Sequence, residues 1–382
     1  MRFKVAKRDL DAALSVVDSS ISSGGADLSA HFLFRRVPGE KDGEYGIEVM
    51  TYSGRIFSSC PVIGSVEDAG DAGAFTIEGA RLKAWLSCVS DGQPLEFTLD
   101  DKDVVARATR GKQTFQSLDP DSFPYWDKML KKAKVTATID SERMAAALGY
   151  SKLFASDKER SKPELCVCEV KAGILFSTDK KAVCLVEAEG LVNSSMRVHY
   201  KDANGFIAFL STCDSTQVEV LEHDRMIVMR RGDGAIFGQS RFQAAFPGIN
   251  VGMDKDNQHT WVLPKEEMVN TISWLKSGAA KEDNRLHFMP GKEDGEIIMS
   301  MLSVTGKKTE LPIEAVVSSV DKAPEVPSEG FALDHFCLAK VLSSWKGDTI
   351  KLGINVMGDR GFVRFVVEEG NDTFLTIIAW LR

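Results

Sequence analysis

Long apolar segments are missing from this sequence. No apolar run approaches the roughly 20 residues that a membrane-spanning helix needs. The first residues, MRFKVAKR, mix charged and apolar side chains and lack the apolar core of a signal peptide. We therefore expect a cytoplasmic protein that has no membrane partner.

Cysteine pairs and enzyme motifs are missing too. The seven cysteines are odd in number and form no CxxC, so we expect buried, reduced thiols rather than disulfides or a zinc site. The histidines show no metal-ligand spacing, and the sequence has no HExxH, Walker loop, GxSxG or dinucleotide fingerprint. We therefore expect no catalytic residue, no metal and no cofactor. A metal-dependent enzyme acting on nucleic acid stays an alternative, because carboxylates far apart in the sequence can converge on a metal.

The composition is that of an ordinary globular protein. Of the 382 residues, 43% are hydrophobic and 27% are charged, so a large core is available. The length allows two or three domains. The formal net charge of -8 argues against a protein that coats nucleic acid indiscriminately, but it is compatible with a basic face on an acidic body.

The chain contains a long repeat. The stretch FQSLDPDSFP at 115–124 resembles FGQSRFQAAFP at 237–247, and their Phe-Pro pairs begin 123 residues apart. Proline disfavours helices and central strands, so both stretches are predicted to be connectors. This spacing predicts three domains, which cover residues 1–124, 125–247 and 248–382.

A finer repeat predicts six helices. In six segments two large apolar residues stand four positions apart, which places both on one face of a helix. These pairs are Leu10/Leu14, Leu82/Leu86, Met144/Leu148, Phe206/Leu210, Met268/Ile272 and Leu338/Leu342. After the helices the pattern changes to alternating apolar residues with Asp-Gly and related turn signals, which predicts strands joined by hairpins.

Together these patterns predict an α+β protein. Each half-unit of roughly 60 residues has a strand, a helix and then a meander of strands, and two half-units make one domain. We expect three such domains to form an arc with the helices on one side and the sheets on the other. A β-rich repeat protein with a structural role, such as a capsid protein, is an alternative, and it would lack a basic helical face.

The connectors and the middle of the chain carry a resemblance to a known family. Residues 153–190, LFASDKERSKPELCVCEVKAGILFSTDKKAVCLVEAEG, contain a helix end, an exposed loop, a strand and a Thr178-Asp179 turn, in that order. This order and the repeat resemble the beta sliding clamp, the beta subunit of bacterial DNA polymerase III. The chain is similar to a divergent member of bacterial or phage origin.

The resemblance implies a DNA-clamp fold and a function without catalysis. Members of this family form head-to-tail homodimeric rings around duplex DNA, with helices lining the inside and sheets outside. The ring tethers DNA polymerase to its template, and an ATP-dependent clamp loader opens and closes it. The resemblance therefore implies a processivity factor of DNA replication that binds double-stranded DNA without sequence preference.

A sliding ring needs diffuse positive charge on its inner face, because it must attract phosphates without reading bases. The predicted helices and the loops after them supply such residues. The expected DNA contacts are Lys7, Arg8, Arg81, Lys83, Arg143, Lys152, Lys158, Arg160, Lys162, Lys201, Lys265, Lys276, Lys281, Arg285 and Lys340. Solvated helix faces are the alternative for each of them. The matching loop of the first domain, 19–31, has no basic residue, which departs from the family.

The resemblance also implies an apolar groove between the second and third domains, where partner proteins insert a short apolar peptide. The matching positions are Leu165, Thr178, Pro247, Val251, Ile377, Ile378, Ala379, Trp380 and Leu381. The tail TIIAWLR departs from the family, which usually has Pro near Ala379 and Met near Trp380, so we expect Trp380 to reshape the groove. The alternative for this tail is a last strand that closes the sheet, and both interpretations can hold together.

Ring closure is expected to join the first domain of one subunit to the third domain of the other. The segment ISWLKSG at 272–278 matches the family's interface helix and indicates Trp274 and Leu275 as dimer contacts. A place in the internal core is the alternative for both residues. A head-to-tail contact closes a ring of two subunits when each subunit spans half a turn.

Overall fold

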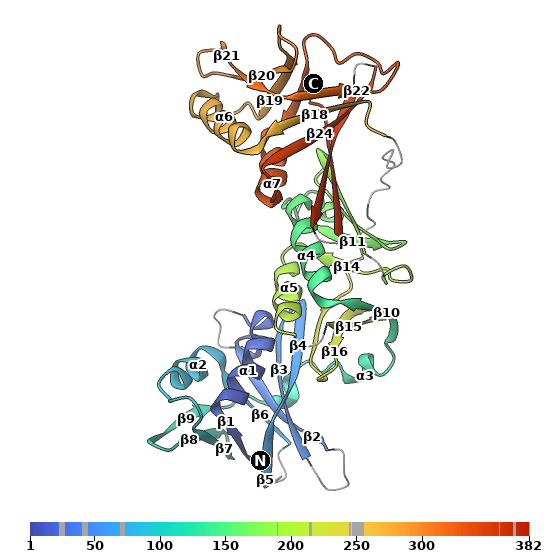
Figure 1. Cartoon of the computed structure of the whole chain (residues 1–382). Helices are drawn as coiled ribbons and strands as arrows, with labels where there is room; N and C mark the ends of the chain where they lie inside the picture. The colour runs from blue at the N-terminus through green and yellow to red at the C-terminus, as the bar shows by residue number, and fades with distance from the viewer. Residues whose placement is uncertain are drawn as a thin grey trace. The chain divides into compact units, whose positions relative to one another are not determined.

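Two compact units make up the chain (Figure 1). The first contains Met1–Leu148 and Glu189–Gln243, and the second contains Gly149–Ala188 and Ala244–Arg382. The structure is a computed structural model that describes residues 1–382 except 23–26, 40–44, 69–72, 189, 214–215, 244–245, 247–255, 359, 370–371 and 382.

The first unit is built on two antiparallel sheets. Their strand orders are β5-β1-β7-β8-β9 and β10-β15-β16-β17-β4-β3-β2-β6. The strands of the smaller sheet are β1 (Arg2–Ala6), β5 (Gly64–Asp68), β7 (Pro94–Asp100), β8 (Asp103–Ala108) and β9 (Gly111–Gln116). The strands of the larger sheet are β2 (His31–Pro38), β3 (Tyr45–Ser53), β4 (Ile56–Val62), β6 (Ala74–Glu78), β10 (Lys134–Asp140), β15 (Gln217–His223), β16 (Met226–Arg231) and β17 (Ile236–Ser240). The unit also contains the short strand β14 (Arg197–His199).

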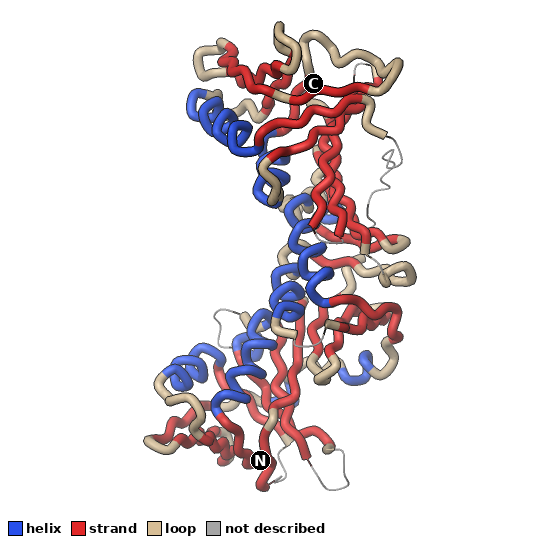
Figure 2. Tube along the Cα trace, viewed as in Figure 1, coloured by secondary structure: helices blue, strands red, loops and turns tan. Residues whose placement is uncertain are grey.

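The long helices of the first unit lie on one side of its sheets, as Figure 2 shows. They are α1 (Lys7–Val17), α2 (Gly79–Ser87) and α5 (Ala203–Ser211), and α4 (Ser141–Ser151) also begins in this unit. Both members of each predicted apolar pair are buried, including Leu10 and Leu14 of α1. The four-residue spacing therefore identified these helices and their buried faces correctly.

A cluster of phenylalanines fills the core between the two sheets of the first unit. Phe3 of β1 stacks on Phe75 and Phe97 with ring centroids 5.7 and 5.1 Å away, and Phe34 lies 5.8 Å from Phe3. All four rings are fully buried. Stacked and tilted pairs at these distances add to the free energy that apolar burial supplies, by about 0.5–1.5 kcal/mol per pair.

The first predicted connector forms a packed joint within this unit. Its short helix α3 (Asp127–Leu130) follows Phe123 and Trp126, which are both buried. The Trp126 ring lies 4.6 Å from that of Phe57 in β4, in a cluster that also contains residues of β2, β3, β15, β16 and β17. The connector therefore covers the larger sheet where β4 and β17 meet.

An arginine fastens the same connector to the sheet. Arg35 of β2 donates two hydrogen bonds of 2.7 Å to the Asp127 carboxylate and one of 2.6 Å to Glu48. The bidentate geometry favours this pair over an ordinary surface ion pair. The hydrogen bond from Arg35 also lowers the pKa of Asp127.

The second unit also has two antiparallel sheets. The larger contains the order β11-β12-β13-β26-β25-β24-β18-β22, and the smaller has the order β21-β20-β19-β23. The strands of the larger sheet are β11 (Val167–Lys171), β12 (Ile174–Thr178), β13 (Ala182–Glu187), β18 (His259–Pro264), β22 (Val316–Ser319), β24 (Thr349–Met357), β25 (Arg360–Glu369) and β26 (Asp372–Ala379). The strands of the smaller sheet are β19 (Arg285–Pro290), β20 (Glu296–Leu302), β21 (Lys308–Glu314) and β23 (Phe331–Asp334).

Two helices lie in the C-terminal part of this second unit. They are α6 (Lys265–Gly278) and α7 (His335–Ser344), and Figure 2 shows both on one side of the unit's sheets. Met268, Ile272, Leu338 and Leu342 are buried, as their spacing predicted. The strand β26 lies between β13 and β25, so the tail does complete a sheet.

The sheets extend across the predicted domain joints. In the first unit β17 pairs with β4, with Ile236 opposite Ser59, and in the second unit β13 pairs with β26, with Val183 opposite Ile377. Each compact unit contains one of these shared sheets. The division into three domains at residues 124 and 247 stays a prediction.

The helices of the chain are short. Among the described residues, no helix combines the length and the apolar character that crossing a membrane requires. In the same part of the chain, no group of three or more His, Cys, Asp and Glu side chains is placed to hold a metal ion. The seven cysteines are free thiols, and five of them are buried.

Candidate functional site

A groove lies at one end of the larger sheet of the second unit. It encloses about 710 Å³ and is lined by residues at the ends of β13, β25 and β26 and by the segment that leads into β23. Val183, Phe362 and Ile377 form an apolar floor, and Lys180 and Arg360 stand among the residues at its border. An extended apolar segment with a polar flank is the kind of ligand that such a groove can hold.

The register of three strands builds the apolar floor. Val183 of β13 lies opposite Ile377 of β26, and Phe362 of β25 lies opposite Ala379. Residues that are opposite or two apart on neighbouring strands share one face of a sheet, so these side chains gather on the same side. Ile377 and Phe362 also pack with Leu185 in one apolar cluster.

The tail beyond β26 forms a wall of the groove. The indole of Trp380 stacks on the Phe331 ring with a centroid distance of 5.0 Å and an interplanar angle of 7°. The Trp380 N–H donates to the Gly361 carbonyl at 3.0 Å, and the Leu381 N–H donates to the Ala332 carbonyl at 2.8 Å. The tail is therefore held by backbone bonds on both sides and presents its aromatic residue in a fixed position.

A tight turn between β12 and β13 forms the opposite border. The Thr178 hydroxyl donates to the Ala182 carbonyl at 2.7 Å and accepts from the Lys180 N–H at 3.0 Å. The Asp179 carboxylate accepts the N–H groups of Lys181 and Ala182 at 2.9 and 3.0 Å. Lys180 has a φ of 77°, in the left-handed region that side chains rarely adopt. These four bonds explain why a Thr-Asp pair stands at this turn.

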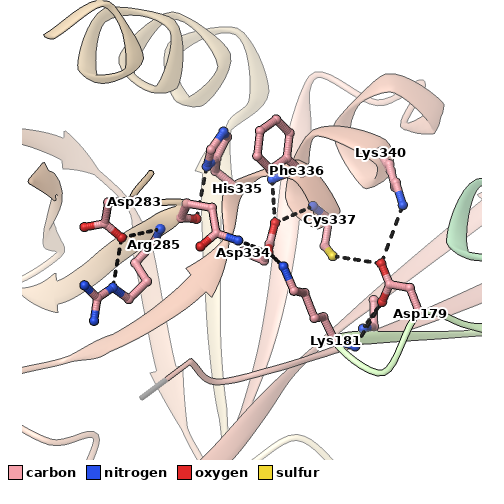
Figure 3. Close-up of polar contacts among 11 residues, drawn as sticks. Asp179, Lys181, Asp283, Arg285, Asp334, His335, Phe336, Cys337 and Lys340 are labelled. Atoms are coloured by element: carbon pink, nitrogen blue, oxygen red, sulfur yellow. Dashed lines mark hydrogen bonds and ion pairs between the residues drawn. The ribbon is translucent and has the colours of Figure 1, made fainter. Parts of the chain in front are cut away.

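Polar contacts fasten this turn to the start of α7 (Figure 3). The Lys181 ammonium donates to the Asp334 carboxylate at 2.5 Å, and Asp334 is 1% exposed. The same carboxylate accepts the N–H groups of Phe336 and Cys337 at 2.9 and 3.3 Å, so it also caps the helix. The bond to Asp334 raises the pKa of Lys181. The turn, the helix start and the groove border therefore form one connected structure.

Cys337 is a thiol beside this turn, and its environment suppresses reactivity. Its sulfur lies 3.8 Å from the Asp179 carboxylate, which Lys340 approaches at 3.7 Å. Burial, together with the negative charge of Asp179, raises the pKa of the Cys337 thiol to about 12. The thiolate is the nucleophilic form, and the raised pKa disfavours it at neutral pH.

Several of the lysines and arginines that we expected to contact DNA are engaged by carboxylates. Lys7 is 8% exposed, and its ammonium lies 2.7 Å from both Asp11 and Asp91, whose hydrogen bonds raise its pKa. Other pairs are Arg81 with Glu78, Lys83 with Asp18, Arg285 with Asp283, and Lys340 with Asp179. Surface pairs of this kind are weak and can open, whereas Lys7 is held by burial as well.

Other expected DNA contacts are accessible. Exposed positions are occupied by Arg8, Lys158, Arg160, Lys201, Lys276 and Lys281, while Arg143, Lys152, Lys162 and Lys265 are half-buried. Lys276 lies with its ammonium 5.7 Å from the Phe336 ring, and the Lys265 ammonium donates to the Trp345 carbonyl. The helical side of each unit thus presents scattered positive charge rather than a dense basic patch.

Solved structures share this fold over its full length. The chain matches DNA polymerase III subunit beta from Pseudomonas aeruginosa with a TM-score of 0.80, 13% identity and 100% coverage of both chains. The beta subunit from Thermotoga maritima matches with a TM-score of 0.78 and 15% identity, over 100% of this chain and 99% of that chain. The fold is that of the bacterial DNA sliding clamps.

A third clamp structure comes from Bartonella birtlesii and is bound to griselimycin. It matches with a TM-score of 0.79 and 14% identity over 100% of both chains. No protein-family model and no curated protein matches the sequence. At identities of 13–15%, the comparison with sliding clamps rests on the similarity of the backbone fold. In the sequence, the resemblance rested on the repeat pattern.

The clamp fold places the expected groove residues in different environments. Ile377, Ala379, Trp380 and Leu381 line the groove described above. Ile378 is fully buried on the opposite face of β26, and Leu165 is fully buried too. Thr178 is 4% exposed and organises the turn. Pro247 and Val251 lie outside the described residues.

Sequence reasoning missed several residues that line this part of the clamp fold. They are Val183, Phe331, Met357, Arg360 and Phe362, together with residues before β23. Val183 had a weak signal, because it follows the turn at an alternating apolar position. Phe331 and Phe362 had none, because their approach to the tail depends on strand pairing between distant segments.

The two expected dimer contacts differ in exposure. Leu275 is 1% exposed and belongs to the core of its unit, as the alternative for it stated. Trp274 is 57% exposed on α6 and is therefore available to another molecule. Large exposed aromatics are enriched in protein interfaces.

Proposed function

We propose that this protein is a sliding clamp that encircles duplex DNA and tethers a DNA polymerase to its template. The observation that carries this proposal is the match of the whole chain to bacterial clamps, with TM-scores of 0.78–0.80 and no missing part. Similarity over one domain would leave other arrangements open, whereas similarity over the full chain includes every repeat. In this proposal the protein acts in the cytoplasm without a catalytic site of its own.

The groove is proposed as the place where polymerase and other partners bind. Its apolar floor of Val183, Phe362 and Ile377 suits a short apolar peptide, and the stack of Trp380 on Phe331 provides an aromatic wall. A preformed groove reduces the conformational entropy that the protein loses on binding. A flexible peptide still loses its own conformational entropy. We therefore expect modest affinities, which suit partners that exchange.

DNA contact is proposed through the scattered basic residues of the helical sides. Arg8, Lys158, Arg160 and Lys281 are exposed, and their side chains can approach phosphates through water. Lys7 is held by Asp11 and Asp91, so we assign it a structural role instead. Contacts that are few, exposed and independent of base sequence permit movement along the duplex.

Ring closure is proposed to pair two copies head to tail. Edge strand β9 in the first unit carries Lys112 and follows Arg110, whereas edge strand β21 in the second unit carries Lys308, Glu310 and Glu314 and is negative on balance. Charges of opposite sign favour the approach of these edges, and unpaired edge strands readily accept a partner strand. Exposed Trp274 adds apolar area. A closed ring needs an ATP-dependent loader to reach circular DNA.

The test of the clamp proposal is topological. Protein, loader and ATP are incubated with nicked circular DNA, and the complexes are then passed over a sizing column in salt that removes ordinary DNA binders. We expect the protein to elute with the circle, because an encircling ring is not held by phosphate contacts. Cutting the circle with a restriction enzyme should release it.

Two outcomes would contradict this proposal. Retention that persists after the circle is cut would show binding without encirclement. Failure to be retained on any circle, with a loader that is active on another clamp and with confirmed ring dimers, would show that the protein is not loaded. Blocking both ends of the cut DNA with bound protein is the control, since it should restore retention.

A further inference from the structure

Two cations at the groove have no counter-ion in the described part of the chain. Lys180 and Arg360 both line the groove and both are exposed, and neither forms an ion pair with a described residue. Their neighbour Lys181 differs, because its ammonium is already bound to the buried Asp334 carboxylate. Glu329 is the one acidic residue among those that line the groove. Among the described residues, Lys180 and Arg360 are therefore the positive charges of the groove that form no ion pair.

Strand geometry brings these two residues to opposite sides of the tail. Ala379 donates to the Lys181 carbonyl, and Trp380 donates to the Gly361 carbonyl, each at 3.0 Å. The backbone beside Lys180 and that beside Arg360 are thus separated by one intervening chain, or about 9–10 Å. Both side chains are long and flexible, so both can reach a single anionic group that lies above the tail.

The position of Lys180 is fixed by the turn that carries it. Its N–H donates to Thr178, its φ is 77°, and the following residue is tied to α7 through Asp334. A lysine on a mobile loop would lose more freedom on binding than one that leaves a fixed backbone. The turn therefore holds one charge at the groove border, next to the apolar floor.

We propose that the groove selects apolar peptides that carry a carboxylate beside their apolar anchor, with Lys180 and Arg360 as the residues that read this charge. This inference rests on the proposed function, since it names the class of peptide that the partner site accepts. The anchor occupies the floor of Val183, Phe362 and Ile377, while an Asp or Glu next to it lies between the two cations. Trp380 and Phe331 limit the anchor on the side of the tail.

The size of the effect follows from the exposure of the cations. An exposed ion pair raises binding affinity by up to about fivefold. Two cations acting on one carboxylate are expected to give roughly tenfold selectivity over the matching amide. Salt should reduce this selectivity, because ions screen exposed charges within about 10 Å at 0.1 M.

The experiment is selection from a random heptapeptide display library, run on the full chain and on the variant with Lys180→Gln and Arg360→Gln. Lys171→Gln is the matched control, because Lys171 is an exposed lysine of β11 in the same unit that does not line this groove. One enriched peptide is then synthesised with Asp and with Asn, and both are titrated by fluorescence anisotropy at low and high salt.

We expect the full chain and the control to enrich apolar peptides with an adjacent Asp or Glu, and the double variant to enrich apolar peptides without one. The Asp peptide should bind the unsubstituted protein about tenfold more tightly than the Asn peptide does. The double variant should bind the two peptides with equal affinity. Enrichment of apolar peptides without acid by the full chain overturns this inference alone. A groove that enriches no apolar peptide contradicts the proposed partner site itself.

Discussion

Gly361 decides where the indole of Trp380 can lie. A Cβ at this position would stand 2.6 Å from the indole ring and 2.5 Å from the Asn355 carbonyl oxygen, closer than van der Waals contact allows. The glycine and the tryptophan are therefore complementary residues. This pair explains how the tail can carry a large ring beside β25.

We predict that Gly361→Ala displaces Trp380 from Phe331 and weakens peptide binding in the groove. Overpacking of this kind costs about 1–3 kcal/mol of folding free energy. Gly278→Ala in α6 is the control, since an added Cβ there meets no atom within 4 Å. Thermal unfolding and peptide titration are measured for both variants.

The effect of Gly361→Ala on binding should depend on the indole. In a variant that already carries Trp380→Ala, the glycine substitution should change peptide affinity much less than in the protein that keeps Trp380. The reason is that substitutions of interacting residues do not act additively. Equal losses of affinity in both backgrounds would disprove the link between the two residues.

At the scale of elements, the connector at 118–130 behaves as part of the core. Trp126 is 2% exposed and contacts Phe57, whereas Tyr125 is 39% exposed and donates its hydroxyl to the Pro120 carbonyl. Adjacent aromatic residues of one short segment thus have unequal roles. The buried one packs on strands from both sides of the β4–β17 pairing, and the exposed one covers the connector.

We predict that Trp126→Ala lowers the stability of the first unit by about 3–5 kcal/mol, the usual cost of removing a buried large aromatic. Tyr125→Ala is the control and should cost far less, since little of its burial is lost. Hydrogen exchange of β4 and β17 should increase strongly in the first variant, while β25 and β26 keep their protection. Similar losses from both substitutions would contradict the assignment.

Local patterns explain which elements could be predicted from the sequence. Each helix was visible because its buried pair, such as Leu10 and Leu14, stands within one turn. The Thr178-Asp179 turn was found through the resemblance to the sliding clamps, and its hydrogen bonds join neighbours in sequence. Pairing of β13 with β26 was not, because it depends on the register between distant segments. For the same reason Arg360 and Phe331 were missed, although the tail residues beside them were found.

At the scale of the whole molecule, assembly depends on surfaces that one chain leaves open. Trp274 is exposed on α6, and the net charges of the edges β9 and β21 are opposite in sign. A head-to-tail dimer uses both ends of each chain, so damage to one end weakens both joints of a ring. Isologous pairing through a single patch would not have this property.

We predict that Trp274→Glu shifts the protein from dimer to monomer with at least a tenfold rise in the dimer dissociation constant. A charge in place of a buried interface aromatic removes apolar contact and adds a desolvation cost. Analytical ultracentrifugation measures the shift. Val192→Glu, at a residue 65% exposed in the first unit, is the control and should leave the dimer intact. An unchanged dimer in Trp274→Glu would remove this residue from the interface.

The central place of β26 in its sheet has a consequence for synthesis on the ribosome. Val183 must wait for Ile377, about 190 positions later, before β13, which already pairs with β12, gains its second partner strand. At 5–20 residues per second this delay lasts on the order of 10–40 s. During that time an apolar strand edge stays open to chaperones and to other nascent chains, so the groove and the last step of folding depend on the same few residues.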